Sequence, residues 1–149
     1  MNHMEQVLVD NKEAGHKIFV GYFPLGDPLM EDSVARVGQF IEDGVDVLEL
    51  GIPYAEPSLD GAVVSDSMAR ALDAMDAREA MDLIADLRKA YPEACLQIMT
   101  YYETIEDMGV EKFCAHAAEL GADGVLAPNV PDGERGRLDA ALNCNGLLR

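Results

Sequence analysis

The sequence predicts an α/β fold in which a parallel sheet is built from four successive strand-and-helix units. Short runs rich in β-branched and aromatic residues alternate with longer amphipathic stretches along all 149 residues, and this order is typical of parallel strands joined by crossover helices. Segments 43–48 and 120–125 also share a helix-ending glycine, an aspartate and an apolar strand, which indicates duplicated units. We therefore expect one domain over residues 1–149.

The first unit begins with a strand at 17–22. Its helix is expected to start at Asp32 or Ser33 and to end at Gly44, because Asp and Ser cap helix N-termini and Gly ends helices. Between these limits, apolar residues recur at helical spacing, which predicts one buried face.

The second and third units follow the same order. Strands are expected at 45–50 and 95–101, a helical region at about 62–89, and a helix at 110–120. The segment 1–17 is polar and mixed in charge, so a signal peptide is not expected there.

The fourth unit has a short strand at 124–127 and a helix at about 132–142. Residues 143–149 have the pattern that leads into a fifth strand. Asp46 and Asp123 precede strands, and we interpret both as structural residues that bond the preceding loop.

Charge and composition exclude several classes of function. The chain has 28 acidic and 11 basic residues and a net charge of −17, which disfavours binding to nucleic acid or to anionic membranes. No apolar run approaches the roughly 20 residues of a membrane span. The 3 cysteines show no metal-ligand spacing, so reduced thiols in a cytoplasmic protein are expected.

Two carboxylates mark the candidate site. Glu49 lies inside an otherwise apolar run, where loss of water would raise its pKa toward the range useful for proton transfer. Asp60 lies in the following loop, where it either caps the next helix or divides acid and base work with Glu49. Glu56 is interpreted as a solvated loop residue.

The segment 48–61 resembles the corresponding strand and loop of the tryptophan synthase alpha chain, and segments 22–28 and 99–102 resemble the first loop and the third strand end of that family. The resemblance implies a fold: the four units would form a (βα)4 half of a TIM-type (β/α)8 barrel, truncated after the fourth unit. It also implies an activity, the lyase reaction of tryptophan biosynthesis that cleaves indole-3-glycerol phosphate to indole and glyceraldehyde 3-phosphate. The alpha chain would use no cofactor and would pass indole to a beta subunit that carries pyridoxal phosphate.

Carried over by resemblance, Glu49 would be the general acid/base, and Asp60 would hold the indole N–H and stabilise the positive charge on the protonated ring. The residues that would line the indole pocket lie at strand ends: Tyr22, Thr100, Tyr102 and Ala127. For each of them an ordinary place in the core is the alternative.

Two other interpretations remain open. The family's phosphate site lies in the second half of the barrel, and no Gly-rich phosphate loop occurs in these residues, so the chain could be a non-catalytic half-barrel that associates with itself or docks to a beta subunit. Exposed sheet edges and an open interior would favour such association. A metal-dependent lyase using Glu49, Glu56 and Asp60 is the third alternative, although no further residue is placed to complete the ligand shell.

Overall fold

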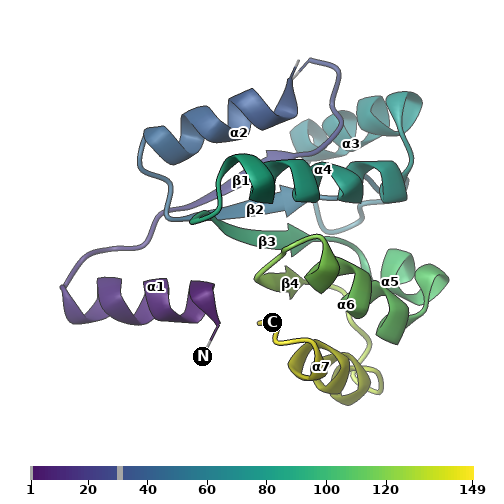
Figure 1. The fold of residues 1–149 in the computed structure, drawn as a ribbon. Coiled ribbons are helices and arrows are strands. Elements are labelled where there is room, and N and C mark those ends of the chain that lie inside the picture. The colour runs from purple at the N-terminus through teal and green to yellow at the C-terminus, as the bar shows by residue number, and fades with distance from the viewer. Residues whose placement is uncertain (1, 30–31) are drawn as a thin grey trace.

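The computed structural model describes residues 2–29 and 32–149 as a four-stranded parallel sheet in the order β1-β2-β3-β4, with helices packed along it (Figure 1). The strands are β1 (Val20–Pro24), β2 (Val47–Gly51), β3 (Cys95–Met99) and β4 (Gly124–Leu126). The helices are α1 (His3–Glu13), α2 (Ser33–Glu42), α3 (Ala62–Ala74), α4 (Ala77–Ala90), α5 (Tyr102–Met108), α6 (Val110–Glu119) and α7 (Arg135–Cys144). The predicted fold class is confirmed.

Strand alternation divides the side chains between two faces of the sheet. On the outer face, Phe23, Leu50, Ile98 and Val125 lie in one row of register partners and pack into the main core beneath the helices. The opposite face, here called the inner face, carries the row that contains Tyr22. Side chains that lie outside the main core gather on this inner face.

The sequence predicted that the repeated aspartates bond the preceding loop, and this prediction is wrong: they bond the start of the neighbouring strand or the residue just before it. Asp46 accepts a hydrogen bond from the Phe19 N–H at 2.8 Å, and its own N–H donates to the Phe19 carbonyl. Asp123 exchanges the same two bonds with Leu96. The internal repeat therefore places the same pair of hydrogen bonds at the start of both strand pairs. Neither aspartate lies near the carboxyl ends of the strands.

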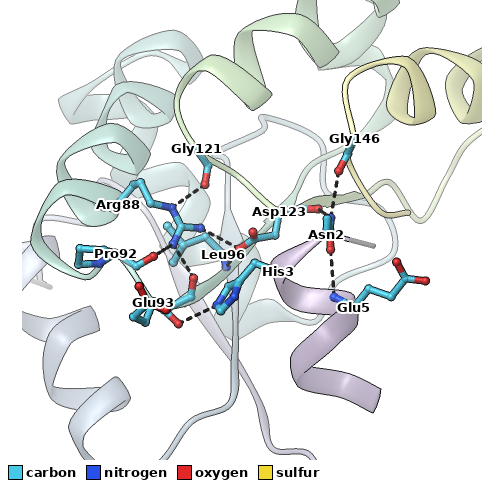
Figure 2. Close-up of polar contacts among 11 residues, drawn as sticks. Asn2, His3, Glu5, Arg88, Pro92, Glu93, Leu96, Gly121, Asp123 and Gly146 are labelled. Carbon is cyan, nitrogen blue, oxygen red and sulfur yellow. Dashed lines mark hydrogen bonds and ion pairs between the residues drawn. The ribbon is translucent and has the colours of Figure 1, made fainter. Parts of the chain in front are cut away.

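Arg88 fastens the same end of the sheet. Its guanidinium forms an ion pair with Asp123 at 2.8 Å and donates to the carbonyls of Gly121, Pro92 and Ala94 (Figure 2). One α4 side chain thus connects the starts of β3 and β4.

Helix α1 was not expected from the polar segment 1–17. Asn2 caps it by accepting from the Glu5 N–H, and the same side chain donates to the carbonyls of Asp123 and Gly146 (Figure 2). Met4 packs against Val47 beneath the inner face. These are long-range contacts, so the helix is held by residues that the local sequence does not reveal.

Several other boundaries differ from the sequence-based expectation. The strand expected at 17–22 spans Val20–Pro24, the one expected at 45–50 spans Val47–Gly51, and the one expected at 95–101 ends at Met99. The region 62–89 is two helices, because Asp76 and Glu79 form a capping box that starts α4. The loop after β3 contains α5, and the last helix starts at Arg135. The expected approach to a fifth strand is visible, since Leu148 forms a parallel bridge with Gly124.

Within residues 2–29 and 32–149, no helix is both long enough and apolar enough to cross a membrane.

Candidate active site

Glu49 is the central carboxylate of the inner face. It lies in the middle of β2, between the register partners Tyr22 on β1 and Gln97 on β3, and it is half-buried. Burial raises the pKa of the Glu49 carboxyl, and the negative charge of Asp60 raises it further. A carboxyl group with a raised pKa can both donate and accept protons closer to neutral pH.

Asp60 is held in place by a tyrosine at the end of the next strand. The Tyr101 hydroxyl donates to the Asp60 carboxylate at 2.7 Å and accepts from the Leu59 N–H at 2.9 Å. The Tyr101 ring stacks on Tyr54, with ring centroids 5.0 Å apart. The Tyr101 hydroxyl therefore fixes the loop after β2 through the Leu59 backbone and through the Asp60 carboxylate.

Tyr101 was not among the candidate residues chosen from the sequence. The signal that could have found it is strand alternation: counted in steps of two from Cys95, position 101 faces the same way as Gln97 and Met99, toward Glu49. The next residue, Tyr102, was chosen instead.

An apolar and aromatic cluster adjoins the two carboxylates, since Tyr22 is the register partner of Glu49 and Tyr101 donates to Asp60. Met68 of α3, Met99 and Tyr101 are buried together on the inner face, with Tyr22 and Leu126 packed against them. Such a surface suits a planar apolar ligand beside two charged groups.

The structure does not bring the other three candidate residues to this cluster. Tyr102 and Ala127 belong to the main core on the outer face, and the Tyr102 hydroxyl donates to Glu134 at 3.0 Å. Thr100 is fully buried and follows Met99, so alternation turns it away from the inner face. For Thr100 and Ala127, which directly continue β3 and β4, the physical reason is parity: a shift of one residue along a strand moves a side chain to the other face. Tyr102 is already the first residue of α5.

A buried ion pair ties the loop after β1 to the helix that follows Asp60. Asp27 is 4% exposed and accepts two hydrogen bonds from Arg70 and one from Ser67, both on α3. These contacts hold the pKa of the Asp27 carboxyl at about 2. Nothing in the local sequence marks this pair, since its members are about 40 residues apart.

The remaining reactive side chains of the described residues do not gather at one site. Among the described residues, no three His, Cys, Asp or Glu side chains are grouped as a metal site would require, and Glu56 is exposed in its loop. Cys95 and Cys114 are buried, which raises the pKa of each thiol to about 11. Thiols with such pKa values are inert near neutral pH.

Fold and site together define a class of protein: four βα units of a TIM-type barrel, with Glu49 on the inner face and Asp60 in the loop that follows the same strand. Comparison with known proteins identifies the family. Residues 8–148 match the family model described as "Tryptophan synthase alpha chain", and the chain belongs to this family.

Individual relatives agree. The chain is 36% identical over 135 residues to a tryptophan synthase alpha chain from Marinobacter nauticus, covering 90% of this chain and 50% of the relative. A relative from Corynebacterium efficiens is 42% identical over 120 residues, covering 80% and 43%. The crystal structure of tryptophan synthase subunit alpha from Legionella pneumophila superposes with a TM-score of 0.92 at 32% identity, covering 99% of this chain and 56% of that one. The chain thus spans about half the length of the curated relatives it matches.

Proposed function

We propose that the inner-face site performs the lyase reaction of the family, the retro-aldol cleavage of indole-3-glycerol phosphate to indole and glyceraldehyde 3-phosphate. The observation that carries the proposal is the pairing of Glu49 with Asp60. The two carboxylates share one face near the carboxyl ends of parallel strands, and Asp60 contributes to the raised pKa of Glu49. Active sites of TIM-type barrels lie at this end.

Glu49 is the residue suited to move protons. The cleavage requires protonation of the indole ring carbon that bears the glycerol chain, and removal of the proton from the adjacent hydroxyl. A single carboxyl group can do both in turn if its pKa is close enough to the working pH. The half-buried position of Glu49 favours this role.

Asp60 is suited to a different task. Because Tyr101 and the loop backbone fix its position, its carboxylate can accept a hydrogen bond from the indole N–H. As the ring is protonated it becomes cationic, and a preorganised carboxylate stabilises that charge. The walls formed by Met68, Met99 and Tyr101 would contact the ring.

The test is release of indole from indole-3-glycerol phosphate by the purified chain, alone and with a tryptophan synthase beta subunit. We expect Glu49→Gln to lower the rate by at least about 100-fold, the usual contribution of a general acid/base. The matched control is Glu119→Gln, because the Glu119 side chain is 78% exposed on α6. Equal rates for Glu49→Gln and the unsubstituted chain, or no indole under either condition, would contradict the proposal.

The beta subunit, the phosphorylated substrate and a cytoplasmic location are parts of the same proposal, and membership of the family supports them. The test above addresses the subunit directly. A rate that rises when the beta subunit is added would show that the two chains interact.

A second candidate role is self-association, and the open edge of β1 favours it. Phe19 is 61% exposed and Val20 47% exposed, and they line a hollow of about 500 Å³ together with Tyr22, Phe40 and Val45. A second copy could cover this edge, which lies at the border of the sheet in Figure 1.

The net charge of −17 per chain opposes association of two copies, so we expect the dimer to form more readily at high salt. Light scattering at low and high ionic strength measures this. A monodisperse monomer under both conditions would rule the association out.

A further inference from the structure

Tyr22 places on the inner face a hydroxyl group that the described chain leaves unpaired. Its Oη atom is buried and has no hydrogen-bond partner among residues 2–29 and 32–149. The hydroxyl lies directly over Gly51, where a Cβ atom would overlap it. A buried donor without an acceptor is costly, so an acceptor from outside these residues is expected to complete the site.

The surrounding charges limit what that acceptor can be. Tyr22 is the register partner of Glu49. Burial, followed by the charges of Asp60 and Glu49, raises the pKa of the Tyr22 phenol. The group therefore stays protonated and acts as a donor. The same carboxylates would repel an anionic acceptor. A neutral alcohol fits, because its oxygen accepts one hydrogen bond and its own proton can be donated to a carboxylate.

The apolar surroundings limit the rest of the ligand. Met68, Met99 and Tyr101 form the buried cluster against which Tyr22 packs. A ligand whose hydroxyl sits on the carbon bonded to a flat apolar ring would place the ring against this cluster and the hydroxyl between Tyr22 and Glu49.

We propose that the Tyr22 hydroxyl donates a hydrogen bond to the substrate hydroxyl from which Glu49 removes a proton. This inference rests on the proposed function. After the ring carbon has been protonated, the O–H proton passes to the Glu49 carboxylate and the oxygen electron pair forms the C=O bond of the aldehyde. The bond between the ring and the side chain breaks, and its electron pair returns to the ring, which becomes neutral indole. Tyr22 keeps its proton and stabilises the negative charge that develops on the oxygen.

Tyr22→Phe removes only the hydroxyl. The matched control is Tyr91→Phe, because Tyr91 ends α4 and its hydroxyl lies over Gly38 of α2, away from the inner face. In the ligand-free protein we expect the Tm of Tyr22→Phe to be unchanged or raised, since the substitution removes an unpaired buried donor. A fall of several degrees would show that the hydroxyl has a partner in the free protein and would overturn the proposal.

Binding provides the second measurement. Indole-3-carbinol and 3-methylindole differ by one hydroxyl, and calorimetry on the full chain gives the ratio of their affinities. We expect the unsubstituted chain to prefer the alcohol by about 2- to 10-fold, as one neutral hydrogen bond allows. Tyr22→Phe should abolish that preference and Tyr91→Phe should keep it.

The outcomes separate this inference from the proposed function. If the unsubstituted chain binds neither probe, the indole site itself is refuted, and the role of Tyr22 with it. If it binds both probes and Tyr22→Phe keeps the preference for the alcohol, only the role of Tyr22 is overturned. In the indole-release assay the same variant should lose about 100-fold in kcat and raise KM by no more than about 10-fold, the pattern of a donor whose hydrogen bond strengthens in the transition state.

Discussion

Replacing Asp27 by Asn removes the charge from a carboxylate that accepts four hydrogen bonds. The donors are the Leu29 N–H, the Ser67 hydroxyl and two nitrogens of Arg70. Asn can accept at one oxygen only, and its amide group would face the guanidinium of Arg70. The substitution therefore weakens the connection between the loop after β1 and α3.

The pKa of Asp27 gives the size of the effect. It lies at about 2 in the folded protein against an ordinary value of 3.8, mainly because of the hydrogen bonds from Arg70. One pKa unit corresponds to about 1.4 kcal/mol, so the ionised carboxylate stabilises the fold by about 2 kcal/mol at neutral pH. Because the Arg70 side chain is 39% exposed, solvent screens its interaction with Asp27. The stabilisation therefore stays at about 2 kcal/mol and does not reach the cost of breaking a fully buried ion pair.

The pH dependence has a definite sign. The folded pKa of Asp27 lies below the unfolded one, so the unfolded chain binds the proton more tightly. The stabilisation is complete above about pH 4 and is lost as the pH falls toward 2. The difference in stability between the unsubstituted chain and Asp27→Asn should shrink over that interval.

Urea unfolding followed by far-ultraviolet circular dichroism measures both effects, and the chain has no Trp to use as a fluorescent probe. The control is Asp139→Asn, since Asp139 pairs with Arg149 at a similar distance but is 44% exposed. We expect a loss of about 2 kcal/mol for Asp27→Asn and less than about 0.5 kcal/mol for the control. Equal losses for both variants, or a difference that does not change between pH 5 and pH 2, would refute the reasoning.

Three further outcomes are expected. Glu49 must start protonated in order to donate to the ring carbon, so its pKa sets the alkaline limb of the indole-release rate. Because the Asp60 charge raises that pKa, the alkaline limb should shift to lower pH in Asp60→Asn, and an unmoved limb in the pH profile of the residual activity would show that the coupling is absent. Arg88→Met should lower stability by about 3 kcal/mol in urea unfolding, because it leaves the buried Asp123 without its ion-pair partner; a loss below about 1 kcal/mol would argue against the network. Gly44→Ala should lower the free energy of unfolding by about 1 kcal/mol, since φ is +97° there and, among the described residues, an added Cβ meets no non-neighbouring atom within 4 Å. A neutral result would mean that the backbone relaxes.

Periodicity and turn chemistry made the fold predictable. Apolar runs of strand length alternating with amphipathic helices predicted four parallel strands, and glycines such as Gly44 and Gly121, both at positive φ, marked helix ends where expected. Glu49 could also be found from the sequence, since a carboxylate in an apolar strand needs a special environment. These are local signals, and each needs only a few neighbouring residues.

The parts that could not be predicted depend on contacts between distant residues. Helix α1 is tied to Asp123 and Gly146 by Asn2, and the ion pair of Asp27 joins residues 43 positions apart. A polar segment or a lone aspartate looks the same in the sequence whether or not such a partner exists.

The sequence by itself determined the order of the four βα units and the resemblance to the family, and it marked the two carboxylates as candidates, because these depend on residue type and spacing. Only the tertiary structure decided which neighbours face them. It placed the Tyr101 hydroxyl against Asp60 and the Tyr102 hydroxyl against Glu134, because Tyr101 precedes α5 and Tyr102 is the first residue of that helix. It also left the Tyr22 hydroxyl, on the register partner of Glu49, buried without a hydrogen-bond partner in the part of the chain that the structure describes, because hydrogen bonding depends on distances in space and not on position along the chain.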